Sequence, residues 1–254
     1  TVLTGYDSTM VTLCEQVDVI LVGDSAGMVM LGYDNTTLVT MDDMIRFTTA
    51  AKNARKNSLI VSDLPINSYQ TKKDAIVNSL KLIQAGADAV KLEGGKEVAG
   101  IIKSITESKI PVMGHLGLLP QTAEKYTVQG KTKEDAIQLI EDAKIITESG
   151  VFSIVLEMVT SQVAKIITEK ITVPTIGIGS GKDCDGQVLV VHDMLGLFEK
   201  IKPKFAKRYL DLSEEIRNAV KSYVTEVKEQ TFPADNNEFQ MDETEYNELR
   251  KEIV

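Results

Sequence analysis

The segment TKKDAIVNSLKLIQAGADAVKLE, Thr71–Glu93, is echoed by TKEDAIQLIEDAKIITESGVFSIVLE, Thr132–Glu157. Each opens with a threonine and, three residues later, an aspartate, a pattern typical of a helix-capping box. Each helix is expected to stop at a glycine, Gly86 or Gly150, which suits the left-handed position after a helix. Each then runs into an apolar strand that ends in Leu-Glu. Repeated helix–strand units of this kind predict a parallel sheet covered by helices.

Short apolar, β-branched runs alternate with longer helical patterns along the rest of the chain. Eight such runs without polar alternation favour strands that are buried on both faces. For 254 residues the expected α/β fold is one (β/α)₈ TIM barrel, with a doubly wound open sheet as the alternative. The predicted strands are Val2–Tyr6, Val19–Gly23, Leu59–Ser62, Ala89–Leu92, Val112–Gly114, Ser153–Leu156, Thr175–Ile178 and Val188–Val191.

The two ends of the chain depart from this regular pattern. The short spacing between Tyr6 and Asp18 leaves room only for a very short first helix, unless residues are missing there. The stretch Ser213–Gln230 predicts an amphipathic helix with Ile216, Val220, Val224 and Val227 facing inward. We expect one catalytic barrel domain over residues 1–239 that includes this helix, followed by an acidic extension over residues 240–254.

Composition excludes several classes of protein. The net charge of −9, without a basic stripe, argues against binding to nucleic acid or to an anionic membrane, and no apolar run is long enough to span a bilayer. Cys14 and Cys184 lie far apart, which argues against a disulfide framework and a structural zinc site. A cytoplasmic location is expected, and an organellar one stays open because a targeting peptide before Thr1 can have been removed.

Polar residues stand where most of the predicted strands end. In a barrel the carboxyl ends of the strands converge on one mouth, where active sites form. Acids around one rim repel one another unless a cation lies among them. The residues at these positions are Asp7, Asp24, Asp63, Glu93, His115 and Glu157.

Three of these acids, Asp24, Asp63 and Glu93, suggest a metal site. Carboxylates without a histidine pair or a thiolate suit a hard cation, which favours Mg²⁺, although ligand type alone does not separate it from Mn²⁺ or Co²⁺. Two oxygens of a 2-oxo acid would complete the coordination, and the metal would polarise the keto group and stabilise an enolate. Each acid alone also fits a simple helix cap, a loop residue or a solvated charge.

Four other residues are candidates for the same site. The hydroxyl of Ser25, in LVGDSAGM, can hold a carboxylate or merely cap a helix. Lys91 shares a strand face with Glu93 inside an apolar strand, where charged side chains are usually paired or functional. His115, in GHLGLLPQ, is either a site residue or a structural histidine, and Glu157 is a fourth ligand, a general base or a rim carboxylate.

The sequence GIGSG, Gly177–Gly181, has two interpretations. Barrels often bind phosphate after their last strands, and a glycine-rich loop can cradle it. The same glycines also simply allow a strand end to turn tightly, and this second interpretation is favoured.

Taken in order, several motifs resemble the ketopantoate hydroxymethyltransferase family over about Thr1–Phe239. They are TGYDS, LVGDSAGM, SDLPINSY, AGADAVKLEGG, PVMGHLGLLPQ, VLEMV, VPTIGIGSG, DGQVLVVHD and PKFAKRYLDL. The resemblance implies a barrel like those of the phosphoenolpyruvate/pyruvate superfamily. It also implies transfer of a one-carbon unit from 5,10-methylenetetrahydrofolate to 3-methyl-2-oxobutanoate, which gives 2-dehydropantoate for pantothenate synthesis, in a homodecamer.

The resemblance also implies roles for individual residues. Those matching Asp24, Asp63 and Glu93 form the Mg²⁺ site, one ion per subunit, directly or through water, so that Asp24 and Asp63 also lie against the substrate. Those matching Ser25, Lys91 and His115 contact the oxo acid. The one matching Glu157 is the base or acid, and a base near the oxo acid can remove its C3 proton to form the enolate that attacks the methylene carbon.

Two alternatives stay open at this point. A metal-dependent carbon–carbon lyase or mutase acting on a 2-oxo acid shares the barrel and the cation, but typically carries a catalytic cysteine in a loop unlike those around Cys14 and Cys184. A barrel kept only for binding predicts the loss of some rim acids, and all of them are present.

Overall fold

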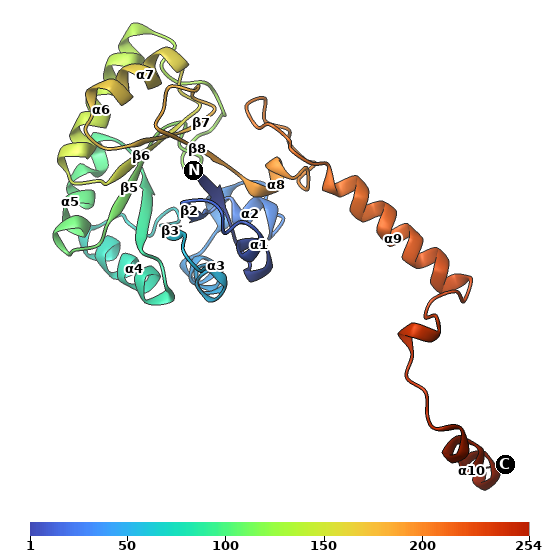
Figure 1. Cartoon of the computed structure of the whole chain (residues 1–254). Coiled ribbons are helices and arrows are strands. Elements are labelled where there is room, and N and C mark those ends of the chain that lie inside the picture. The colour runs from blue at the N-terminus through green and yellow to red at the C-terminus, as the bar shows by residue number, and fades with distance from the viewer. Residues whose placement is uncertain (254) are drawn as a thin grey trace. The chain divides into compact units, whose positions relative to one another are not determined.

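Eight parallel strands close into a barrel in the computed structural model, which describes residues 1–253 (Figure 1). Each strand pairs with the next one in sequence, and β8 closes the ring by pairing with β1. Every predicted strand overlaps an observed one, so the predicted (β/α)₈ fold is confirmed and the open sheet is excluded. The strands are β1 Val2–Thr4, β2 Val19–Val22, β3 Leu59–Asp63, β4 Ala89–Glu93, β5 Val112–Gly117, β6 Ser153–Glu157, β7 Thr175–Ile178 and β8 Gly186–Leu189.

Helices of unequal length follow the strands. The first is short, Ser8–Leu13, as the spacing before Asp18 predicts. The α-helices are α1 Ser8–Leu13, α2 Ala26–Val29, α3 Met41–Ala54, α4 Lys72–Ala85, α5 Ala99–Glu107, α6 Lys133–Glu148, α7 Ser161–Lys170, α8 Val191–Met194, α9 Leu212–Lys228 and α10 Glu243–Ile253. Between them lie the 3₁₀ helices η1 Thr36–Leu38, η2 Lys96–Val98 and η3 Asp235–Asn237.

The two echoed helices end at the predicted glycines, and their predicted capping boxes are half formed. The Thr71 and Thr132 hydroxyls each accept a hydrogen bond at 3.1 Å from the backbone N–H three residues on. This is half of a capping box, because the return bond from the cap's own N–H to the side chain three residues on is formed at Thr40 of α3 but not at these two threonines. Gly86 and Gly150 follow these helices with φ angles of 115° and 97°, which residues with a Cβ rarely adopt.

The barrel interior determines which side chains reach the mouth. One cluster of buried apolar residues fills it, including Val61, Ala89, Met113 and Val155. Alternate residues of a strand point to the same side. Two positions beyond each of these four residues, the inward-facing side chain at the carboxyl end is polar: Asp63, Lys91, His115 and Glu157 respectively.

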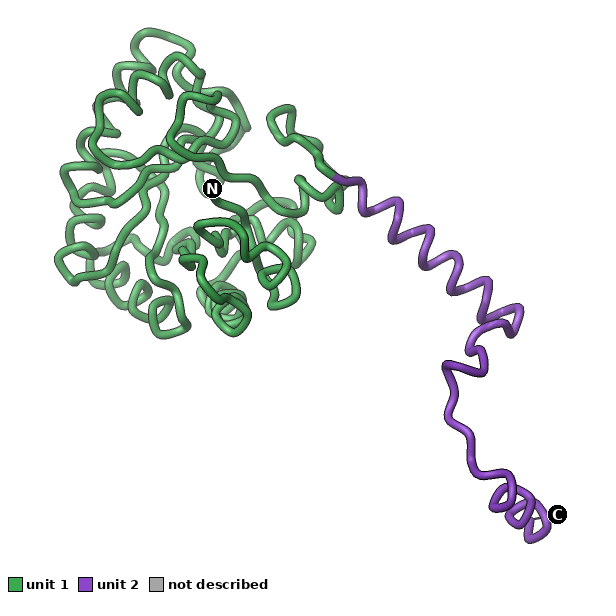
Figure 2. Tube along the Cα trace, in the orientation of Figure 1, with its two compact units in different colours: residues 1–209 green, residues 210–254 purple. Residues whose placement is uncertain are grey.

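The chain divides into two compact units, residues 1–209 and residues 210–254 (Figure 2). The first contains the barrel, and the second contains α9, η3 and α10. The prediction of one domain over residues 1–239 is not tested by this division and stays a prediction. The stripe predicted to face inward on α9 is not buried within its own unit, where Ile216, Val220, Val224 and Val227 are 41–56% exposed. Its inward-facing role stays a prediction. Within residues 1–253, none of the helices is long and apolar enough to cross a membrane.

Candidate active site

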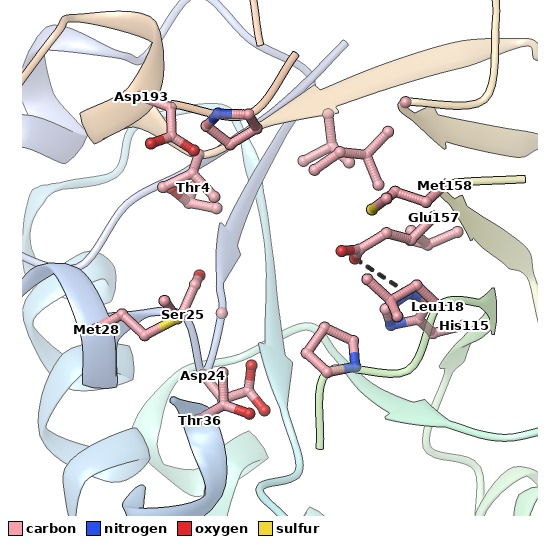
Figure 3. Close-up of a pocket in the computed structure, with 18 of the residues that line it drawn as sticks. Thr4, Asp24, Ser25, Met28, Thr36, His115, Leu118, Glu157, Met158 and Asp193 are labelled. Carbon is pink, nitrogen blue, oxygen red and sulfur yellow. Dashed lines mark ion pairs between the residues drawn. The ribbon is translucent and has the colours of Figure 1, made fainter. Parts of the chain in front are cut away.

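A cavity of about 590 Å³ opens at the carboxyl ends of the strands (Figure 3). Its walls come from loops and strand ends that are distant in sequence. All seven site residues predicted from the sequence line it, namely Asp24, Ser25, Asp63, Lys91, Glu93, His115 and Glu157. The convergence of strand ends in a parallel barrel therefore brings these residues together as expected.

A buried ion pair of the site joins Asp63 to Lys91. The two residues are neighbours in the register of β3 and β4, and the Lys91 ammonium lies 2.8 Å from Asp63 Oδ1. Both side chains are 5% exposed or less. Burial alone would lower the pKa of Lys91, but the charges of Asp63 and Glu93 outweigh it and raise that pKa. Lys91 is therefore a fixed positive charge on the cavity floor.

Asp24 lies beside this pair, at a position where a negative charge is unfavourable. Its backbone N–H donates to Asp63 Oδ2 at 3.0 Å, so the two acidic residues are in direct contact. Burial, followed by repulsion from Asp63 and Glu93, raises the pKa of Asp24 to about 8. Ionising Asp24 would place a third negative charge beside Asp63 and Glu93, which is unfavourable unless a cation is bound there.

Gln121 ties the acids to one another, and the sequence did not assign it a role. Its side-chain amide donates to Asp24 Oδ2 at 2.8 Å and to the Leu64 carbonyl at 3.0 Å. Its backbone N–H donates to Glu93 Oε2 at 3.1 Å, and its amide oxygen accepts from the Tyr69 hydroxyl at 2.6 Å. Gln121 is 2% exposed, so this network is sheltered from water and fixes both carboxylates.

His115 bridges two carboxylates on either side of its strand. Nδ1 lies 3.3 Å from Glu93 Oε1, and Nε2 lies 3.3 Å from Glu157 Oε2, the contact dashed in Figure 3. Both contacts lack hydrogen-bond geometry and act as charge pairs. Burial opposes protonation, yet the two neighbouring carboxylates raise the pKa of His115 to about 9. The imidazolium in turn outweighs the effect of burial on Glu93 and lowers the pKa of that carboxyl.

Ser25 and Asp7 show how differently two possible helix caps behave. The Ser25 hydroxyl makes no capping bond to α2 and instead pairs with the Tyr6 hydroxyl at 2.8 Å, at the cavity. Asp7 caps α1 by accepting from the Met10 N–H at 2.9 Å and does not line the cavity. The predicted place of Asp7 at the mouth is therefore wrong, because Asp7 caps a helix outside the cavity, and the interpretation of Ser25 as a mere helix cap is wrong as well.

The glycine-rich turn at Gly177–Gly181 is filled by the protein itself. The Ser180 hydroxyl donates to the Leu156 carbonyl at 2.7 Å and accepts from the Val159 N–H at 3.0 Å. A Cβ at Gly179 would lie 2.8 Å from the Phe205 ring. The tight-turn interpretation accounts for these glycines.

The donor set fits a partly hydrated Mg²⁺ better than a metal cage made by the protein. In residues 1–253 no group of three or more histidine, cysteine or acidic side chains is arranged to hold a metal ion by itself. Mg²⁺ commonly keeps several waters and uses one or two carboxylates plus substrate oxygens. Asp24, Asp63 and Glu93 supply hard oxygen donors at the cavity, and their mutual repulsion favours a cation there. Their assignment as metal ligands stays a prediction.

Replacing Gln121 tests whether the network positions these acids. In Gln121→Met, Asp24 loses its side-chain donor at 2.8 Å, whereas the backbone N–H that binds Glu93 is kept. We expect Mg²⁺ affinity to fall roughly 10- to 100-fold, the usual effect of losing an outer partner. Calorimetric titration with Mg²⁺ measures the affinity of each variant for the ion. Gln129→Met is the matched control, because the Gln129 side-chain amide donates to Thr127 of its own loop and not to the acids of the site. Unchanged affinity in Gln121→Met would contradict the positioning role.

Comparison with known proteins agrees with this geometry. The model of the ketopantoate hydroxymethyltransferase family matches residues 1–235. A protein of Nitrosopumilus maritimus named 3-methyl-2-oxobutanoate hydroxymethyltransferase is 59% identical, over 99% of this chain and 92% of its own length. A protein of the same name from Cenarchaeum symbiosum is 56% identical, over 98% of this chain and 97% of its own.

Solved structures extend the likeness at the level of the fold. Phosphonopyruvate hydrolase, solved with oxalate and Mg²⁺, has a TM-score of 0.61 and 12% identity, covering 99% of this chain and 92% of its own. The 2,3-dimethylmalate lyase of the PEP mutase/isocitrate lyase superfamily has a TM-score of 0.55 and 14% identity, covering 100% and 93%. These neighbours confirm the predicted kind of barrel.

A closed parallel barrel with ionisable side chains gathered in a cavity at its strand ends defines a (β/α)₈-barrel enzyme. The match over residues 1–235 and the two relatives above narrow that class. The chain belongs to the ketopantoate hydroxymethyltransferase family.

Proposed function

We propose that the chain transfers a hydroxymethyl group from 5,10-methylenetetrahydrofolate to 3-methyl-2-oxobutanoate. The family match and the names of its relatives support this reaction. The C3–H bond of the oxo acid is broken and a bond from C3 to the methylene carbon is formed. Both bonds from that carbon to folate nitrogens are broken, and water supplies the hydroxyl group. The products are 2-dehydropantoate and tetrahydrofolate.

The observation that carries the proposal is the position of Glu157. Its side chain is 17% exposed and lines the same cavity as the buried acids and Lys91. Nε2 of His115 holds one carboxylate oxygen at 3.3 Å, and Figure 3 draws Glu157 extending from β6 toward that ring. A carboxylate oriented in this way, with access to the cavity, can take a proton from the substrate.

The other residues bind and orient the oxo acid. Lys91 provides a fixed positive charge for the carboxylate of the substrate, and the protonated His115 and the Ser25 hydroxyl can donate to its oxygens. Asp24, Asp63 and Glu93 would hold Mg²⁺, directly or through water. When bound, the ion would supply positive charge beside the keto oxygen as negative charge develops there.

Two further features belong to the same proposal. The subunits form a homo-oligomer, a homodecamer by resemblance to the family, and the protein works in the cytoplasm. Analytical ultracentrifugation of the purified chain tests the oligomeric state. The lyase or mutase alternative has the same fold, but neither Cys14 nor Cys184 lines the cavity, so no residue observed here favours it.

Binding of Mg²⁺ is expected to depend on pH through Asp24. Its pKa is raised to about 8, so this carboxyl is mostly protonated at pH 7 and must release its proton when a cation binds. Affinity for Mg²⁺ should rise by up to about tenfold per pH unit below pH 8 and level off above it. Titration calorimetry in buffers of different ionisation enthalpy measures the released proton. A pH-independent affinity between pH 6 and 8 would contradict this expectation.

The proposed reaction is tested by product formation. Purified protein with Mg²⁺, 3-methyl-2-oxobutanoate and 5,10-methylenetetrahydrofolate should form 2-dehydropantoate and tetrahydrofolate in equal amounts, as measured by mass spectrometry. Omission of either substrate should abolish the product. Cleavage of 2,3-dimethylmalate without hydroxymethyl transfer would instead support the lyase alternative.

A further inference from the structure

The cavity is larger and more apolar than a five-carbon oxo acid requires. The predicted site residues form its polar floor and the wall at Glu157. Much of the remaining lining is apolar or aromatic, including Met28, Leu118, Tyr126, Met158, Phe198 and Phe205. Apolar walls of this kind suit a flat ring system, whose faces lose water on binding.

One carboxylate interrupts this apolar part. Asp193, on the four-residue helix α8 after β8, lines the cavity and is half-buried. No hydrogen bond or ion pair to its side chain is formed within residues 1–253. Burial, partly offset by the charge of Arg208, raises its pKa to about 6, so it is mostly ionised at neutral pH. A partly desolvated carboxylate without a donor is unfavourable unless a ligand supplies one.

The oxo acid does not meet this demand, because it is an anion without N–H donors. The pterin ring of the folate co-substrate does. Its 2-amino group and the neighbouring ring N3–H are adjacent donors in one plane, which match the two oxygens of a carboxylate. We propose that the apolar part of the cavity binds the pterin ring and that Asp193 accepts hydrogen bonds from its 2-amino and N3–H groups. This inference rests on the proposed function.

The orientation that follows is consistent with the chemistry. In Figure 3 Asp193 and Glu157 lie on opposite sides of the cavity. The methylene carbon bridges N5 and N10, at the end of the ring system remote from the 2-amino group. Holding the 2-amino edge at Asp193 therefore directs the methylene carbon toward the part of the cavity where Glu157 and the oxo acid meet. The exposed Lys204, also on the cavity lining, is available to the glutamate tail.

Asp193→Asn and Asp193→Ala test the assignment by equilibrium binding of tetrahydrofolate. We expect affinity to fall roughly 30- to 100-fold, because a charge-assisted pair of hydrogen bonds is lost. A tetrahydrofolate analogue with methyl in place of the 2-amino group should bind wild type about as weakly as tetrahydrofolate binds the variants. The affinity of this analogue should fall little further in the variants. Asp183→Asn, at an exposed site outside the cavity, should bind both ligands like wild type.

A second readout separates this inference from the proposed function. Exchange of the C3 proton of 3-methyl-2-oxobutanoate with D₂O needs no folate, so both Asp193 variants should retain the wild-type exchange rate. The role of Asp193 would be overturned, and the function left standing, by variants that bind tetrahydrofolate as tightly as wild type does. The same holds for variants that prefer tetrahydrofolate over the methyl analogue by as large a factor as wild type does. Loss of exchange in the variants would also overturn it. Wild type that neither exchanges the proton nor binds tetrahydrofolate would overturn the function itself.

Discussion

Glu157→Gln is expected to lower kcat for hydroxymethyl transfer roughly 10²- to 10⁴-fold, the usual contribution of a general base. The amide has nearly the shape of the carboxylate but cannot take the C3 proton. Because Glu157 is 17% exposed and lies at the end of β6, the fold should tolerate the change. Steady-state kinetics and thermal unfolding measure the two effects.

The matched control is Glu169→Gln, which changes an exposed glutamate on α7 away from the cavity. It should keep wild-type kcat. A Glu157→Gln enzyme within tenfold of wild-type kcat would show that another group takes the proton.

Lys91→Met should produce the largest loss of stability among the site variants. Removing one partner of a buried ion pair leaves an uncompensated charge and typically costs about 3–5 kcal/mol. Here Asp63, with a side chain 3% exposed, would lose the ammonium at 2.8 Å and remain beside Asp24. Chemical denaturation of the metal-free protein measures the change in the free energy of unfolding. Activity should fall as well, since Lys91 is proposed to bind the substrate carboxylate.

The double variant Lys91→Met/Asp63→Asn provides the internal control. With both charges removed, we expect part of the stability to return, so that the two changes are strongly non-additive. Lys165→Met, at an exposed position on α7, should change the free energy of unfolding by less than about 0.5 kcal/mol. Additive effects of the Lys91 and Asp63 changes would contradict a coupled buried pair.

Strand periodicity made much of this site predictable. Asp63, Lys91, His115 and Glu157 each follow an inward-facing apolar residue by two positions, so the strands that form the core also aim these side chains at the mouth. The same reasoning misplaced Asp7, because the short strand β1 ends at Thr4 and the chain has already turned into α1. A polar residue after a strand is informative only when the strand reaches it.

The rest of the site lies in segments without a repeating pattern. Gln121 follows β5 in an irregular loop, and its contacts to Asp24 and Leu64 join residues far apart in the chain. Asp193 lies on a four-residue helix, too short for any helical periodicity to show which way its side chain points. Such positions depend on how loops pack over the finished barrel, which neither propensity nor hydrophobic spacing determines.

Deuterium exchange at C3 of 3-methyl-2-oxobutanoate tests the central claim most directly. The protein is mixed with Mg²⁺ and the oxo acid in D₂O, without folate, and the C3 proton is followed by NMR. The proposed chemistry predicts that the signal disappears at an enzyme-dependent rate, and that EDTA or Glu157→Gln abolishes the exchange. No exchange in folded, Mg²⁺-loaded wild-type protein would contradict it.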